Sequence, residues 1–134
     1  MKSMENQKCD IYKITSIKQI NESLFQISVN AINTFYLRRN YLQNQNIILD
    51  VDIELSIEEF EDCMNAGFSF LAEKKAMDYL GKTEHSRFLL KNKLQKKEYS
   101  LNSINQALDY LEEKGYLDDS RFAMAFLRNR SITH

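Results

Sequence analysis

The chain is 134 residues long, which is enough for one or two small domains that bury hydrophobic cores. Hydrophobic residues make up 43% of it, which is ordinary for a folded protein and argues against a disordered chain. The formal net charge of −1 gives no overall basic character that would by itself indicate nucleic-acid binding. There is no run of about 18 apolar residues, so we expect no membrane span.

The two cysteines and the first residues bear on the compartment in which the protein works. Cys9 and Cys63 lie far apart and form no CxxC pattern. We interpret both as reduced thiols and not as a disulfide or a zinc site. Residues 1–8 lead into no apolar stretch, so we expect no secretory signal. These features predict a cytoplasmic protein without a metal site.

The first third of the chain has the composition of a small antiparallel sheet. Residues 12–17 and 24–29 carry β-branched or aromatic side chains in near alternation, with a polar turn between them. Residues 31–36 fit a third short strand. We interpret residues 38–45 as a short helix and residues 47–55 as a connection or a short strand.

Beyond this region the hydrophobic period becomes helical. The chain has no proline and only three glycines, so the usual helix breakers are scarce. Ser56 and Glu59 have the spacing of a capping box, and the helix that they begin is expected to end at Gly81. Its predicted apolar stripe consists of Ile57, Phe60, Met64, Phe68, Leu71, Met77 and Leu80.

Two further helices follow the first one. Thr83 or Ser86 caps the second helix, and the third helix begins near residues 100–102. Gly115 ends the third helix, because glycine readily takes the conformation that follows a helix terminus. The predicted inward-facing residues are Leu90 and Leu94 in the second helix and Ile104, Ala107, Leu108 and Leu111 in the third.

A fourth helix introduces an internal repeat. Asp118 or Asp119 caps this helix, and its inward-facing residues are predicted to be Phe122, Ala123, Phe126 and Leu127. Residues 76–80 recur as residues 123–127, so the fourth helix would open a second three-helix unit. The chain stops where that unit needs its second helix, and the apolar residues of the fourth helix are expected to lack part of their cover. Alternatively, the fourth helix completes a single four-helix domain.

The sequence therefore predicts an α+β fold. A small N-terminal antiparallel β-sheet, in a domain of residues 1–55, precedes an all-α region of residues 56–134. The first three-helix repeat covers about 56–115, and the first helix of a second repeat covers 118–134.

Several segments of the helical region form a recognisable pattern. The most specific of them, residues 115–123, reads Gly-Tyr-Leu-Asp-Asp-Ser-Arg-Phe-Ala. Its glycine ends one helix, its tyrosine and leucine pack into the core, and an aspartate caps the next helix. The residues of this motif are Gly115, Tyr116, Leu117, Asp118, Asp119, Phe122 and Ala123. Together with residues 76–80, 86–90 and 104–111, the motif resembles the RecX family of bacterial RecA regulators.

The resemblance covers about residues 66–130, and the N-terminal sheet more loosely resembles the strand-rich extension of some family members. One departure is that the family usually has Lys-Gly after the second helix, where this chain has Lys97-Glu98. The resemblance implies a regulator that binds RecA filaments on single-stranded DNA and opposes their extension, their ATP hydrolysis and strand exchange. It implies no catalysis, no cofactor and no small-molecule ligand.

Charge is unevenly distributed along the chain. Residues 50–62 hold seven acids and no base, which we interpret as a solvated helix start in a favourable dipole position. Residues 82–97 hold six bases against Glu84 alone. With two arginines of the fourth helix, these are the candidate contacts to RecA or DNA: Lys82, Arg87, Lys91, Lys93, Lys96, Lys97, Arg128 and Arg130. The alternative for the lysines is a solvated helix face, and the arginines suit the negative end of a helix dipole equally well.

No residues indicate an enzyme. Asp118 and Asp119 have no histidine nearby in the sequence, and no cluster of His, Cys and Glu has the spacing of metal ligands.

Two other functions remain open. A helix-turn-helix DNA-binding protein is disfavoured because lysine mostly contacts phosphate and does not read bases. A non-catalytic structural adaptor would carry the same charges without using them.

Overall fold

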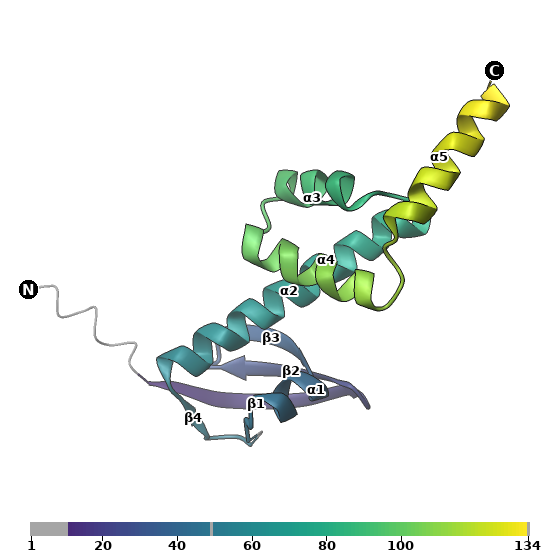
Figure 1. Cartoon of the computed structure of the whole chain (residues 1–134). Coiled ribbons are helices and arrows are strands. Elements are labelled where there is room, and N and C mark those ends of the chain that lie inside the picture. Colours follow the sequence, from purple (N-terminus) through teal and green to yellow (C-terminus); the bar gives the residue numbers. More distant parts are fainter. Residues whose placement is uncertain (1–10, 49, 134) are drawn as a thin grey trace, which may run out of the picture. The chain divides into compact units, whose positions relative to one another are not determined.

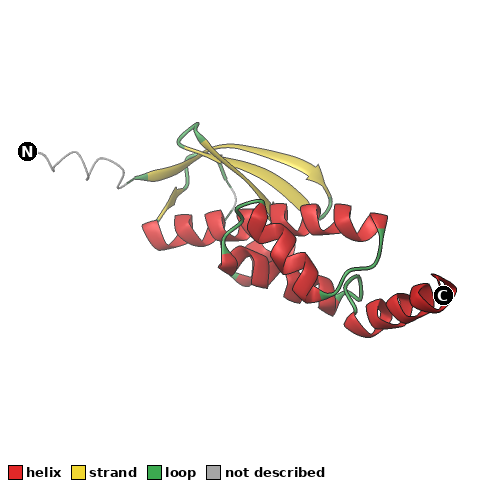
Figure 2. Cartoon of the chain, turned by 90° about the horizontal axis from the view of Figure 1, so that it is seen from above, coloured by secondary structure: helices red, strands yellow, loops and turns green. Residues whose placement is uncertain are grey.

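The computed structural model of the chain describes residues 11–48 and 50–133, and from residue 130 onward only the backbone (Figure 1). The chain divides into two compact units, which meet between Gly67 and Phe68. The strands, yellow in Figure 2, belong to the first unit, and most of the helical residues, red in the same view, belong to the second. The predicted α+β class, an antiparallel sheet followed by helices, is confirmed.

The first unit is built on a four-stranded antiparallel sheet in the order β3-β2-β1-β4. Its strands are β1 (Tyr12–Asn21), β2 (Leu24–Val29), β3 (Asn33–Arg38) and β4 (Glu54–Leu55). Every second residue of β2 is buried, as the alternating sequence predicts. The third strand begins later than predicted because Asn30 and Ala31 take left-handed backbone conformations, with φ of 54° and 60°, in the turn before it.

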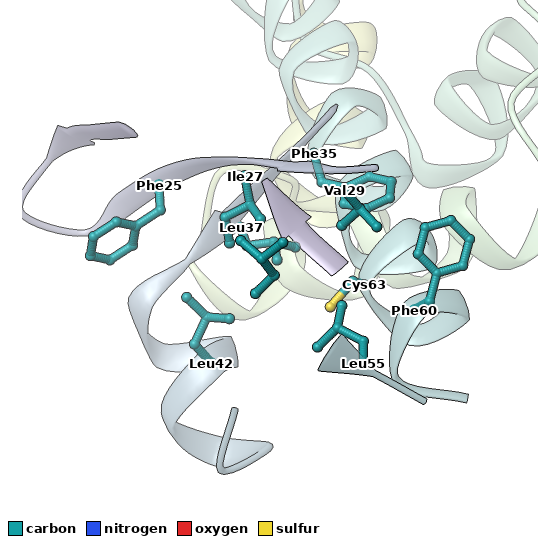
Figure 3. Close-up of a cluster of buried hydrophobic side chains, with 10 residues drawn as sticks. Phe25, Ile27, Val29, Phe35, Leu37, Leu42, Leu55, Phe60 and Cys63 are labelled. Carbon is teal, nitrogen blue, oxygen red and sulfur yellow. The ribbon is translucent and has the colours of Figure 1, made fainter. Parts of the chain in front are cut away.

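One face of the sheet is buried beneath two helical segments of the same unit. Helix α1 (Arg39–Asn44), which the sequence predicts, contributes Leu42. The first turns of α2 (Ile57–Lys82) contribute Phe60 and Cys63, and the Phe60 ring stacks on Tyr12 with centroids 4.2 Å apart. Figure 3 shows side chains of this cluster, which consists of Ile14, Phe25, Ile27, Val29, Phe35, Leu37, Leu42, Leu55, Phe60 and Cys63.

Helix α2 begins with the predicted capping box. The Ser56 hydroxyl accepts a hydrogen bond from the Glu59 N–H at 3.0 Å, and the Glu59 carboxylate accepts one from the Ser56 N–H at 2.8 Å. The helix ends at Lys82, one residue beyond the predicted Gly81. Because its first turns pack on the sheet, the two compact units meet inside α2, whereas the sequence places a domain boundary at residue 55.

The predicted apolar stripe of α2 is wrong at Ile57, which is 54% exposed in the first turn, and again at three residues further along the helix. Phe68 and Leu71 are 48% and 41% exposed, and Met77 is also exposed. The buried side instead carries small and polar residues, which are Ser69, Ala72, Glu73 and Ala76. The Ser69 hydroxyl donates a hydrogen bond of 2.8 Å to Gln106 of α4 (Leu101–Glu113). This hydrogen bond joins the buried side of α2 to α4. The hydrophobic pattern of the sequence alone therefore does not identify which side of α2 is buried.

The second unit has a core where α2, α3 (Arg87–Lys96) and α4 meet. The serines before α3 and α4, Ser86 and Ser100, each accept a hydrogen bond from the N–H three residues later, at 3.1 Å. All six predicted inward-facing residues of these two helices are buried. The core cluster consists of Ala76, Leu90, Leu94, Ile104, Leu108, Leu111 and Leu117.

Helix α5 (Asp119–Thr133) follows the glycine motif. Gly115 has a φ of +81°, the left-handed conformation that ends a helix, and Leu117 is buried as predicted. The prediction that Tyr116 also packs into the core is wrong, because its side chain is 50% exposed. The apolar residues of α5 are not buried in a core, which argues against a single four-helix domain and agrees with the prediction that these residues lack part of their cover. Phe126 and Leu127 are 49% and 59% exposed, Ala123 is exposed and Phe122 is half-buried. These side chains lie outside both buried clusters of the described residues, so their shared helical face is largely open to solvent.

Candidate interaction surface

Arg87, the first residue of α3, is neutralised by α4. Its guanidinium lies 2.7 Å from Glu112 Oε1 and 2.8 Å from Asp109 Oδ1, and its side chain is 27% exposed. The sequence groups Arg87 with the candidate contacts, and the structure instead pairs it with two carboxylates of the neighbouring helix. Arg87 therefore joins α3 to α4 and adds little net positive potential to the surface.

Three other bases lie in α3 or directly after it and have no acidic partner among the described residues; we call them the α3 lysines: Lys91, Lys96 and Lys97. Lys96 and Lys97 are exposed and Lys91 is half-buried. Within the part of the chain that the structure describes, none of the three forms an ion pair. The exposed Lys82, at the end of α2, also has no acidic partner among the described residues. Unpaired surface lysines of this kind favour contacts with anionic groups, and such contacts weaken as salt is added.

Lys93 is held in place by a buried histidine. His85 is 3% exposed, and its Nδ1 lies 2.8 Å from the Thr83 carbonyl oxygen, which only accepts hydrogen bonds. Nδ1 therefore carries the proton, and Nε2 accepts a hydrogen bond from Lys93 Nζ at 2.7 Å. The sequence shows His85 as an isolated histidine, and no spacing pattern announces its role as an acceptor for a lysine.

Arg121 was not among the predicted contacts, yet it organises the start of α5. Its Nε donates a hydrogen bond of 2.6 Å to Glu84 Oε2, and its two other nitrogens donate to the carbonyl oxygens of Gly115 and Tyr116. The planar guanidinium satisfies three acceptors at once. The only sequence signal for this role is the position of Arg121 inside the glycine motif.

The remaining candidate residues are placed as follows. Arg128 is exposed on α5, and the side chain of Arg130 lies outside the described part of the chain. Asp118 and Asp119 accept backbone hydrogen bonds at helix starts. Among the described residues, no group of three His, Cys, Asp or Glu side chains is arranged to hold a metal ion. In the same residues, no helix combines the length and the apolar character needed to cross a membrane.

The shifted pKa values lie in the first unit, away from the α3 lysines in the sequence. Burial, and to a lesser extent the negative charges of Asp62 and Glu59, raise the pKa of the Cys63 thiol to about 11. Burial also raises the pKa of Tyr41 well above its usual value, with the neighbouring Cys63 and Asp62 adding to the effect. Both groups stay protonated and neutral at physiological pH, which suits a core and not a reactive site.

Fold and surface together define a class: a small antiparallel sheet followed by a three-helix unit whose middle helix carries uncompensated lysines. The family model described as "RecX, first three-helix domain" matches residues 72–111, the part of the chain that holds α3 and nearly all of α4. This match, the relatives and the solved structure described below support membership of the RecX family, to which the sequence motif points.

Individual relatives agree with the family model. Proteins named "Regulatory protein RecX" are 38% identical over 60 residues in Prosthecochloris aestuarii, 36% over 63 in Haemophilus influenzae and 43% over 56 in Pelodictyon phaeoclathratiforme. These matches cover 45%, 47% and 42% of this chain but only 40%, 41% and 35% of the relatives. The chain therefore matches less than half the length of these relatives.

A solved structure shares the fold. It is titled "Crystal structure of regulatory protein RecX" and has a TM-score of 0.64 with this chain. The match covers 88% of this chain and 58% of the solved one, at 19% sequence identity. This likeness supports the order of an N-terminal sheet followed by helices.

Proposed function

We propose that this protein is a non-catalytic cytoplasmic regulator of RecA that binds the RecA filament on single-stranded DNA and inhibits it. The observation that carries the proposal is the coincidence of two features in one segment. The stretch that matches the first RecX three-helix domain, residues 72–111, also holds the α3 lysines. The relatives that share this segment are regulatory proteins by name.

The charge pattern of the unit supports an anionic partner. Arg87 and Arg121 are paired with carboxylates inside the unit, whereas Lys91, Lys96 and Lys97 have no acidic partner among the described side chains. A filament of RecA on DNA presents phosphate groups that such a surface attracts. Lysine side chains are long and flexible and hold no fixed hydrogen-bonding geometry. They therefore suit contacts to phosphate groups that do not depend on the base sequence of the DNA.

The test measures ATP hydrolysis by RecA on preformed filaments as the full chain is added. We expect the unchanged chain to inhibit hydrolysis. A variant with Lys91→Glu, Lys96→Glu and Lys97→Glu is expected to lose most of this inhibition, because three charges change sign and an anionic partner is then repelled. Sedimentation of the filament with the bound chain separates loss of binding from loss of inhibition.

A control variant changes the same charge at other exposed lysines. Lys18→Glu, Lys74→Glu and Lys114→Glu alter three exposed positions, one on β1, one on α2 and one after α4. We expect this variant to inhibit nearly as well as the unchanged chain. An equal loss of inhibition in both variants would mean that only the net charge of the chain matters, and not the position of the lysines. Absence of filament binding by the unchanged chain would refute the proposed function.

A further inference from the structure

Two lysines from different helices meet at one tyrosine ring in the second unit. Lys75 of α2 places its Nζ 5.5 Å from the centroid of the Tyr79 ring, and Lys93 of α3 places its Nζ 4.9 Å from the same centroid. Tyr79 is half-buried against the core of this unit. We call Lys75, Tyr79, His85 and Lys93 the Tyr79 cluster.

The position of Lys93 in this cluster is fixed before any partner binds. It donates to the neutral Nε2 of His85, whose other nitrogen is bonded to the Thr83 carbonyl oxygen. The imidazole is buried and lies against Tyr79, with ring centroids 5.9 Å apart. A lysine held between an imidazole and an aromatic face has already lost much of its rotamer freedom, so ordering it on binding costs less than for an ordinary surface lysine.

The cluster also keeps a net positive charge. Neither Lys75 nor Lys93 forms an ion pair with any acidic side chain that the structure describes. His85 is uncharged in the tautomer that its two hydrogen bonds require. Two ammonium groups within 6 Å of one ring centroid therefore have no fixed counter-charge.

We propose that the Tyr79 cluster binds backbone phosphates of single-stranded DNA through the ammonium groups of Lys75 and Lys93. Phosphate groups suit two cations held at one ring, because the charge of each phosphate is spread over several acceptor oxygens. Lys97, the residue that follows α3, comes four residues after Lys93 in the sequence and adds a further cation near the end of the helix, as successive phosphates of a nucleic-acid strand require. Lysines beside a partly exposed aromatic ring are typical of surfaces that bind single strands without sequence preference.

This inference rests on the proposed function only in assigning the DNA strand of the filament, and not RecA itself, as the partner of this cluster. The experiment therefore begins with DNA alone. The full chain is titrated against a fluorescently labelled oligothymidylate, with anisotropy followed at several salt concentrations. The test variant carries Lys75→Ala and Lys93→Ala.

The chain offers a matched control. Lys74 and Lys114 also lie over aromatic rings, at 5.9 Å from the Phe70 centroid and 5.6 Å from the Tyr110 centroid. Lys74→Ala with Lys114→Ala therefore removes the same charge and the same kind of contact from the same unit. Circular dichroism melting of both variants shows whether the helices remain folded. A second test variant, Lys75→Gln with Lys93→Gln, keeps longer side chains for packing on Tyr79 if the alanine variant unfolds.

We expect the test variants to bind oligothymidylate about tenfold more weakly than the unchanged chain, and the control to stay within about twofold. The slope of log K against log salt should become shallower by about 1.4 if two phosphate contacts are lost. Equal weakening by test and control variants would overturn the proposal. So would unchanged DNA binding in the test variants, including the case in which they bind RecA filaments less well, because the cluster would then contact protein.

The same variants separate this inference from the proposed function. If the unchanged chain binds oligothymidylate through the cluster but does not bind or inhibit RecA filaments, the phosphate site stands and the RecA proposal fails. If it inhibits the filaments and the test variants keep full DNA binding, the RecA proposal stands and the phosphate site fails.

Discussion

Asp118 and Asp119 are neighbours in the chain, yet their carboxylates cap two different helices. Asp118 Oδ1 accepts a hydrogen bond of 3.1 Å from the N–H of Arg121 in the first turn of α5. Asp119 Oδ1 accepts one of 2.8 Å from the N–H of Arg87, the first residue of α3. Each carboxylate also places negative charge at the positive end of the helix that it caps. The pair therefore connects the beginning of α5 to the beginning of α3.

This arrangement makes separable predictions for the two aspartates. Asp119→Ala should lower the free energy of unfolding by about 1 kcal/mol, because it leaves the Arg87 N–H without its acceptor. Asp118→Ala should cost a similar amount, but at the start of α5. Amide hydrogen exchange read by NMR distinguishes them: Asp119→Ala should speed exchange at Arg87, and Asp118→Ala should speed exchange at Arg121.

Asparagine substitutions provide the control, because asparagine keeps an acceptor oxygen and caps helices well. Asp118→Asn and Asp119→Asn should lose less stability than the alanine variants. Faster exchange at Arg121 in Asp119→Ala, with Arg87 unchanged, would contradict the division of roles between the two residues.

Arg87 and Lys91 stand four residues apart on α3 and should behave in opposite ways. Arg87→Ala removes contacts of 2.7 Å and 2.8 Å to Glu112 and Asp109, so we expect a loss of about 0.5–1 kcal/mol in stability. Binding to oligothymidylate or to the filament should change by less than about twofold, because the charge was already neutralised. Lys91→Ala should weaken binding and leave stability nearly unchanged. Urea unfolding measures the change in stability, and anisotropy measures the change in binding. A strong loss of binding in Arg87→Ala would show that Arg87 leaves its two carboxylate partners and contacts the binding partner.

Glu98 occupies a position that suits glycine. Its φ is +71°, a left-handed conformation that costs a residue with a Cβ about 1–2 kcal/mol. RecX-like sequences usually carry Lys-Gly where this chain has Lys97-Glu98. We expect Glu98→Gly to raise the free energy of unfolding by about 1 kcal/mol, measured by urea denaturation.

The control for this change is the same substitution inside a helix. Glu113 is the last residue of α4, and Glu113→Gly should destabilise by up to about 1 kcal/mol, because glycine is a poor helix former. A loss of stability in Glu98→Gly would mean that the Glu98 side chain makes a contribution larger than its backbone strain.

Much of the fold was predictable because local signals agree with the tertiary structure. The alternation in β2, the serine caps before α3 and α4, and the apolar stripe of α4 each follow from spacing that the native packing preserves. The buried face of α2 was not predictable, because Ser69 and Ala72 are buried there while Leu71 is exposed. Its orientation depends on a polar contact to Gln106, a residue far along the chain.

The candidate surface was predictable in composition but not in pairing. The sequence shows six bases between residues 82 and 97, but it cannot show that Arg87 meets carboxylates of α4 while the α3 lysines do not. The contact between His85 and Lys93 forms because the α2–α3 connection folds back on α3, and no pattern in the sequence encodes that distance. Long-range pairing of charges therefore needs the structure.

The buried thiol of Cys63 makes stability depend on pH in the alkaline range. Its pKa is about 11 in the folded protein against an ordinary value of 9.0, so the unfolded chain loses this proton first as pH rises. The contribution of the neutral thiol is fully present below pH 9.0 and is lost as pH rises toward about 11. Over that window we expect the free energy of unfolding to fall by up to about 1.4 kcal/mol per pH unit from this group. Urea denaturation at several pH values measures the slope.

Cys63→Ser isolates this contribution, because a serine hydroxyl does not titrate and is close to the thiol in size. The variant will be less stable or more stable overall by a constant amount, but its loss of stability above pH 9.0 should be shallower than that of the unchanged chain. Tyr41 also has a raised pKa, so a further decline should remain in the variant at higher pH and disappear when Tyr41→Phe is added. Identical slopes in the unchanged chain and in Cys63→Ser would mean that the thiol titrates alike in the folded and unfolded states, in conflict with its 2% exposure.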